Sequence, residues 1–287
     1  MTHWEFPGSD PIDLFVDLSA GRVAVAAEPV DVTTVELSAS SFGWGQRPAP
    51  DVQVRFGDGR LEVIGPRRSG LWRGHVGLDL AIKVPAGSRC AVRTASADVI
   101  CTGDVADLDA HTASGDVTAG TVTGTVDATT ASGDVRLDET GAEAHLRTAG
   151  GDVRLARAGG DIEVRTASGG VTIGSAAASV TAATASGDVR IASVAAGHIQ
   201  VTTTSGDVTV GVAAGVGVYL DLASVTGSTV SQLDETQAGD DVQLEVVCRA
   251  VSGDIKIARA QGADSPVRRS FPALETVDTP TTPPPAS

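Results

Sequence analysis

Four polar residues recur every 18 positions in the middle of the sequence: Asp109, Asp127, His145 and Glu163. Two residues before members of this column lie the acids Asp107, Glu143 and Asp161. Two residues after members of it lie His111, Arg147 and Arg165. Carboxylates about 5–9 Å apart can cleave glycosidic bonds. One hypothesis is therefore a polysaccharide-acting enzyme with this column as its catalytic site. The alternative is a solvated sheet that balances acid against arginine.

A second row of carboxylates belongs to a repeated Thr-Ala-Ser-Gly-Asp-Val-like segment. Its members are Asp98, Asp116, Asp134, Asp152, Asp188 and Asp207, with Gly170 in place of one acid. Carboxylates stacked about 4.8 Å apart repel, and such a row could recruit Ca²⁺, with Asp116, Asp134 and Asp152 as candidate ligands. Calcium-binding β-rolls have Gly-rich motifs at both turns of a coil. Only one turn per coil contains Gly-Asp here, which favours Asp as a turn-capping side chain.

A third candidate is a loop in which arginines flank an aromatic residue, formed by Arg67, Arg68, Trp72 and Arg73. It could bind an anionic partner, or it could be a solvated loop with a tucked-in Trp. The sequence has no His/Cys metal cluster, nucleophile elbow, phosphate loop or dinucleotide fingerprint, so no cofactor is expected. We interpret the three cysteines, Cys90, Cys101 and Cys248, as small core residues.

Composition narrows the class of partner. The formal net charge is −15, and Lys occurs only at positions 83 and 256, which argues against nucleic acid. No apolar run approaches the roughly 20 residues that cross a bilayer. The first residues, Met1–Pro7, lack the basic and apolar regions of a signal peptide, so we expect a cytoplasmic protein.

The spacing of the turn segment predicts the fold. It starts at Thr94, Thr112, Thr130, Thr148, Thr166, Thr184 and Thr203, which gives intervals of 18 residues and finally 19. Apolar residues alternate on both sides of it, as in half-buried strands. We expect a parallel β-solenoid with two short strands per coil and φ-permissive glycines in the turns. Its inner ladder is Val99, Val117, Val135, Val153, Val171, Val189 and Val208.

Burial of four aliphatic residues gains roughly 6–8 kcal/mol per coil, which is less than the entropy cost of ordering the coil. Only the stacked array is therefore expected to fold. Residues 1–88 are predicted to form an irregular N-terminal β cap continuous with the solenoid, 89–260 the repeat solenoid, and 261–287 a disordered Pro-rich tail. Within the cap, a turn at Ser19–Gly21 is expected to separate two strands, and a last motif copy, Val251–Ile255, is expected to close the array.

Three segments resemble the bacterial putative-adhesin family of β-strand repeats, a domain of unknown function, in its actinobacterial type. They are Pro11–Val23, the 18-residue array, and Gly217–Leu222 followed by Val251–Ile257. The family name implies surface adhesion, and the resemblance supplies no catalytic residues. Together with the regular array and the missing catalytic set, this predicts a non-enzymatic, adhesin-like repeat scaffold that binds a protein or glycan partner. The glycan-acting enzyme and the calcium-binding module remain the alternatives.

Overall fold

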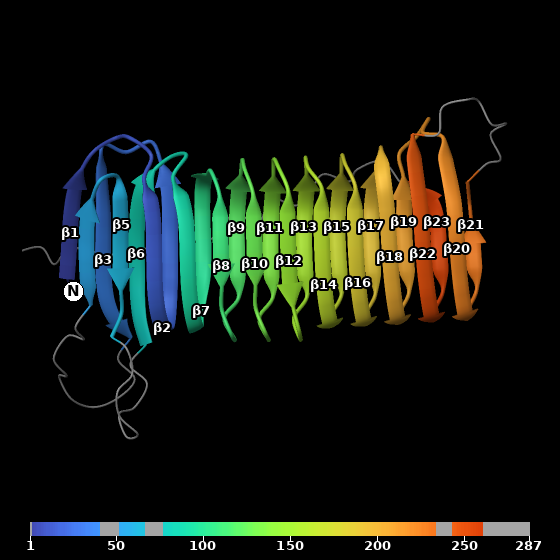
Figure 1. Cartoon of the computed structure of the whole chain (residues 1–287), viewed down its shortest axis with the longest axis horizontal. Helices are drawn as coiled ribbons and strands as arrows, with labels where there is room; N and C mark the ends of the chain where they lie inside the picture. The colour runs from blue at the N-terminus through green and yellow to red at the C-terminus, as the bar shows by residue number, and fades with distance from the viewer. Residues whose placement is uncertain (1, 41–51, 67–76, 234–242, 261–287) are drawn as a thin grey trace, which may run out of the picture.

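The computed structural model describes residues 2–40, 52–66, 77–233 and 243–260. Within these ranges all the elements are β-strands, and 23 of them wind into one elongated, continuously hydrogen-bonded sheet (Figure 1). The part of the chain that is described contains no helix long and apolar enough to cross a membrane. The architecture is the expected parallel β-solenoid.

Each repeat contributes one strand before the turn motif and one after it, and the two series form the opposite faces of the solenoid. The series before the motif, called the leading sheet, consists of β8 (Leu108–His111), β10 (Val126–Thr129), β12 (Ala144–Thr148), β14 (Ile162–Ser168), β16 (Val180–Ser186), β18 (Gly197–Ser205), β22 (Leu244–Ser252) and β20 (Val218–Thr226). The trailing sheet consists of β9 (Val117–Val122), β11 (Val135–Thr140), β13 (Val153–Ala158), β15 (Val171–Ala176), β17 (Val189–Val194), β19 (Val208–Val212), β23 (Ile255–Arg259) and β21 (Thr229–Ser231).

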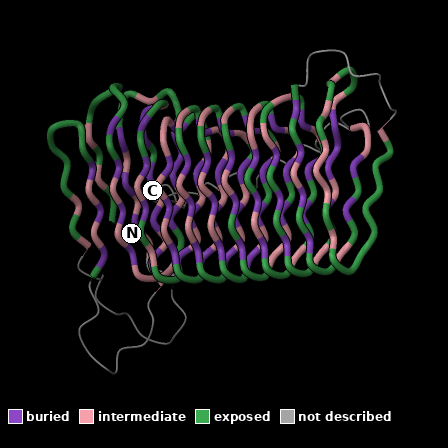
Figure 2. The backbone as a smooth tube through the Cα atoms, turned by 45° about the vertical axis from the view of Figure 1, so that its right-hand side comes forward, coloured by how far each residue is buried: buried purple, intermediate pink, exposed green. Residues whose placement is uncertain are grey.

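The valine ladder lies in register, as predicted. Val117 pairs with Val99 on one side and with Val135 on the other, and the series continues through Val153 to Val208. Every member is at most 1% exposed. Buried residues alternate with less buried ones along the strands of the repeat (Figure 2). The buried apolar side chains of both sheets form one core.

Close stacking of the coils explains the motif glycine. A Cβ on Gly115, Gly133 or Gly151 would lie 1.9–2.0 Å from a backbone carbonyl oxygen of the preceding coil. These three residues do not have positive φ angles, whereas Gly206 and Gly253 adopt φ of 144° and 140°. The expectation of φ-permissive glycines thus holds only in later coils. In the earlier coils glycine is required because no side chain fits between the two backbones.

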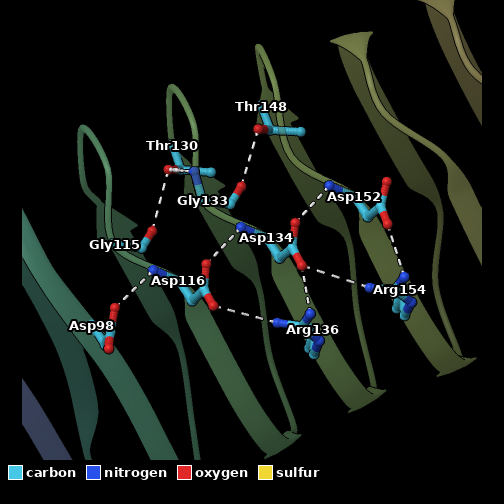
Figure 3. A network of polar contacts seen from close by, with 10 residues as sticks. All are labelled: Asp98, Gly115, Asp116, Thr130, Gly133, Asp134, Arg136, Thr148, Asp152 and Arg154. Carbon is cyan, nitrogen blue, oxygen red and sulfur yellow. Dashed lines mark hydrogen bonds and ion pairs between the residues drawn. The ribbon is translucent and has the colours of Figure 1, made fainter.

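The other polar residues of the motif satisfy backbone groups between coils (Figure 3). The Thr130 hydroxyl accepts a hydrogen bond from Gly133 N at 3.0 Å and donates one to the Gly115 carbonyl at 3.3 Å. Asp134 N donates to Asp116 Oδ1 at 2.9 Å. Asp therefore caps a turn amide, as expected, but the amide belongs to the next coil. The motif is a repeating hydrogen-bond ladder along the solenoid axis.

The N-terminal region combines solenoid strands with antiparallel strands. Its elements are β1 (Thr2–Pro7), β2 (Asp13–Glu28), β3 (Val32–Ser40), β4 (Gln53–Gly57), β5 (Arg60–Ile64), β6 (Gly77–Pro85) and β7 (Arg89–Val105). β2 lies parallel to β7 and stays paired through the corner, with Ala20 opposite Ser96, so the turn expected at Ser19–Gly21 does not interrupt the strand. Antiparallel β3 and β1 cover β6, and antiparallel β4 covers β5.

The last two coils are stacked in the reverse of their sequence order. β22 pairs with β18 on one side and with β20 on the other, and β23 lies in the same way between β19 and β21. The final motif copy, Val251–Ile255, thus lies inside the array and does not close it. The outermost coil, visible at the right of Figure 1, is formed by β20 and β21.

All three cysteines are buried core residues, as predicted, with exposed fractions of 0–2%. Contact with Cys90 and burial raise the pKa of the Cys101 thiol well above its ordinary value. Burial raises the pKa of Cys248 to about 12. The thiols of Cys101 and Cys248 therefore stay protonated at neutral pH. All three cysteines pack as small apolar side chains.

Candidate functional site

The candidate column lies on the outer face of the leading sheet. Strand register places Asp127 between Asp109 and His145, and His145 next to Glu163. Neighbouring parallel strands are about 4.8 Å apart, so these side chains form one row along the solenoid axis. The structure thus brings together the four residues that the spacing predicted to be neighbours.

A groove of about 600 Å³ runs over this row toward the N-terminal end. It starts at Phe15 on β2, crosses β7, β8 and β10, and ends at Glu143 and His145 beside β12. A smaller depression of about 210 Å³ shares Glu143 and His145 and continues toward Glu163 and Thr181. Polar side chains of several successive coils therefore line one elongated depression.

Asp107 is the most firmly held carboxylate of the groove. Its Oδ1 accepts hydrogen bonds from the Thr125 backbone N at 2.8 Å and from the Thr125 hydroxyl at 3.0 Å, and its Oδ2 accepts one from Arg89 Nε at 3.1 Å. The Thr125 backbone amide, with help from the hydroxyl and Arg89, lowers the pKa of Asp107 below its ordinary value. Arg89 also lies 3.5 Å from Asp13, so this end of the groove is fixed by charge pairing.

The two aspartates in the middle of the groove have fewer partners. Asp127 accepts one hydrogen bond among the described residues, from the Thr129 hydroxyl at 3.4 Å. Asp109 Oδ1 lies 2.7 Å from His111 Nε2 but receives no hydrogen bond in the part of the chain described here. Asp109 Oδ1 is itself buried, so acceptor capacity for hydroxyl or amino groups of a ligand rests with Asp127 and with Oδ2 of Asp109.

At the other end, His145 lies between two glutamates. Its Nδ1 is 2.9 Å from Glu163 Oε2, and its Nε2 is 3.1 Å from Glu143 Oε1. Glu163 also contacts Arg165 at 2.6 Å and Arg147 at 3.7 Å. Both imidazole nitrogens are thus occupied within the sheet. This arrangement balances charge and leaves neither nitrogen directed at a ligand.

An aromatic ring marks the N-terminal end of the groove. The guanidinium carbons of Arg60 and Arg93 lie 5.9 Å and 5.7 Å from the centroid of the Phe15 ring. Such cation–π contacts hold a half-buried ring in place. Sequence reasoning missed Phe15, Arg60 and Arg89 as groove residues because they precede the repeat. The alternation in Asp13–Asp17, which points Asp13, Phe15 and Asp17 outward, was the signal available.

The Asp row is occupied by other interactions. Asp134 Oδ1 accepts a hydrogen bond from Asp152 N at 2.8 Å, and Oδ2 of the same residue pairs with Arg136. The described residues contain no group of three or more His, Cys, Asp or Glu side chains that could hold a metal ion. Asp116, Asp134 and Asp152 therefore serve the ladder between coils in this structure (Figure 3).

The candidate partner loop lies outside the described residues. This applies to Arg67, Arg68, Trp72 and Arg73.

Comparison with known proteins identifies a family. A family model described as Toastrack DUF4097 matches residues 13–258, from the start of β2 almost to the end of β23. No curated protein matches the sequence.

Several solved structures are similar to this chain. A putative adhesin from Parabacteroides merdae is 11% identical, with a TM-score of 0.49, covering 88% of this chain and 95% of that one. A putative adhesin from Bacteroides fragilis is 16% identical, with a TM-score of 0.47 and coverage of 89% and 96%. A putative lipid binding protein from Parabacteroides distasonis is 10% identical, with a TM-score of 0.45 and the same coverage.

Proposed function

This chain belongs to the Toastrack DUF4097 family, and from that premise we propose that it is a non-enzymatic scaffold that binds a neutral or amino-bearing glycan. The ligand lies along the solenoid axis in the groove between Phe15 and His145. One observation carries the proposal. The groove presents polar groups at the regular spacing of the coils, which suits a polymer of repeated hydroxyl-rich units.

The chemistry of the lining supports this ligand class. Asp109 and Asp127 offer acceptors for sugar hydroxyls, and the half-buried Phe15 side chain adds apolar surface at one end. Small-molecule sites commonly combine apolar surface with a few polar groups that fix orientation. The groove is open along its length, so it can take a chain longer than itself.

Charge narrows the ligand further. The lining holds five carboxylates against two guanidinium groups, those of Arg60 and Arg89. Uronic or sulfated glycans would meet net repulsion, whereas neutral units or protonated amino groups would not. We therefore expect selectivity for neutral and amino-bearing glycans.

The surroundings of the carboxylates favour binding over cleavage. Glycoside hydrolysis needs one acid that protonates the leaving group and one that acts as base or nucleophile. Asp107 is held ionised by the Thr125 amide, and both nitrogens of His145 face glutamates. Neither residue is therefore placed to act as the acid that protonates a leaving group.

The test is an isothermal calorimetric titration of the full chain with neutral, amino-bearing and sulfated oligosaccharides. A hydrogen bond to a charged group is worth about 1.5–3 kcal/mol and one to a neutral amide oxygen about 0.5–1.5 kcal/mol, so Asp127→Asn should reduce affinity about tenfold. Asp138→Asn is the matched control, because Asp138 is exposed on the trailing sheet, away from the groove.

Three results would contradict the proposal. The first is that the chain binds no neutral or amino-bearing glycan. The second is that Asp127→Asn binds the glycan as tightly as the unmodified chain does. The third is that the chain binds a basic peptide more tightly than any glycan. Shortening of the bound glycan, lost in Asp127→Asn, would support the hydrolase instead.

A further inference from the structure

The two ends of the solenoid differ in the direction and the sequence of their outer strands. At the N-terminal end, antiparallel strands lie over β5 and β6. At the other end, β20 pairs only with β22 and β21 only with β23 among the described residues. The outer edge of β20 therefore presents backbone N–H and C=O groups along its nine residues.

The open end also exposes residues that are core residues elsewhere. Val218, Leu220 and Leu222 pair in register with Leu244, Val246 and Cys248, each 0% exposed. In the last coil, Val218, Leu220 and Leu222 are only partly buried. A further coil stacked on this end would bury them, which makes the end a hydrophobic surface with an unpaired strand edge.

The outer strands at the two ends also differ in sequence. β1 contains His3, Glu5 and Pro7, and charges and proline on an edge oppose pairing with another chain. β20 and β21 together contain no proline and one charged residue, Asp221, which is paired with Arg249. In a chain of net charge −15, these two strands are almost uncharged.

We propose that a second copy of this chain docks on the β20–β21 end, so that two solenoids join end to end. A twofold axis perpendicular to both sheets places β20 antiparallel to β20 of the partner, and β21 antiparallel to its equivalent. Both sheets then continue across the junction. A second copy fits because each protomer offers the same two apolar strands, whose one charged residue, Asp221, is paired with Arg249.

The dimensions predict a reversible dimer. A nine-residue strand is about 30 Å long, and two sheets about 10 Å apart with their outer side chains make an end about 20 Å wide. Each copy buries about 600 Å², or about 1,200 Å² in total, at the lower limit for a stable interface. The acidic remainder of each chain repels its partner at long range, so added salt should strengthen the dimer.

Sedimentation velocity of the full chain at about 1–300 μM brackets the affinity of an interface this small. We expect a monomer–dimer equilibrium that shifts toward dimer in about 0.5 M salt, where charge repulsion is screened. Leu220→Lys should weaken dimerisation at least tenfold, because it places a charge on the inner side of the open edge. Tyr219→Lys is the control, since residue 219 faces outward beside Glu245.

Amide hydrogen exchange separates loss of docking from loss of folding. In the unmodified chain, amides of β20 should exchange more slowly at high than at low concentration, while those of β1 stay unchanged. A monomer at all concentrations and salt levels would overturn the proposal. So would concentration-independent exchange in β20, or equal weakening by the two substitutions.

Discussion

Replacement of the motif glycine at position 151 by alanine tests the stacking argument directly. The added Cβ would lie 1.9 Å from the Gly133 carbonyl oxygen, so the two coils must separate by about 1.5 Å to reach van der Waals distance. The neighbouring Gly150 provides a matched control. A Cβ there would meet nothing closer than 3.7 Å, and its φ is not positive.

The magnitude follows from the hydrogen bonds that such a shift disrupts. Several join this turn to the preceding coil, and we count three of them: Gly150 N to Ala131 O at 2.9 Å, Asp152 N to Asp134 Oδ1 at 2.8 Å, and Thr148 Oγ1 to Gly133 O at 3.2 Å. At about 1 kcal/mol each, Gly151→Ala should lower the free energy of unfolding by about 3 kcal/mol. Gly150→Ala should be neutral or stabilise by up to about 1 kcal/mol, because alanine restricts the unfolded chain.

Guanidinium unfolding followed by circular dichroism, together with thermal melting, measures the difference. For a chain of this size, 3 kcal/mol corresponds to a decrease in Tm of about 6–12 °C. If Gly151→Ala were no less stable than Gly150→Ala, close backbone stacking would not be the reason for the glycine.

Three further predictions concern the thiols, the Asp row and the groove. Iodoacetamide at about pH 8 should modify none of the thiols of the folded chain and all three after unfolding, because all three are buried in the core; rapid modification of the folded protein would contradict the burial. Asp134→Ala should destabilise by about 1–2 kcal/mol in denaturant, and Asp134→Asn by less, because the amide oxygen can still accept the bond from Asp152 N; equal losses would assign the effect to the arginine pairs instead. The pKa of Asp107 is lower in the folded chain than in the unfolded chain, where it is about 3.9. This difference stabilises the fold at pH values above about 3.9, and the stabilisation is lost as the pH falls through the folded pKa. Acid titration of Asp107→Asn should therefore show a shallower loss of stability below about pH 4, and an unchanged acid profile would contradict this role of the Thr125 amide.

The groove was only partly predictable from sequence. The 18-residue period placed Asp109, Asp127, His145 and Glu163 in one row, and strand pairing confirms those neighbours. The period could not indicate that Phe15 and Arg60 complete the depression. They belong to strands outside the repeat, and β2 reaches β7 only by pairing across 76 positions, as in Asp13 with Arg89.

The sequence alone determined the coil length, the two strands per coil, the inward valines and the burial of the cysteines. These depend on local alternation and on a period that makes equivalent residues neighbours. The order of the last two coils was decided only by the tertiary structure, because every coil has a similar apolar pattern and can stack on any other. The β22–β23 coil has Asp254 to bond Ser228 N of the next coil, whereas Ser228 occupies the Asp position of the β20–β21 coil and offers no carboxylate. The trailing strand of the β20–β21 coil has only three residues, so this coil can make fewer hydrogen bonds to neighbouring coils than the β22–β23 coil can. It therefore lies at the end of the array, where a coil has one neighbour instead of two.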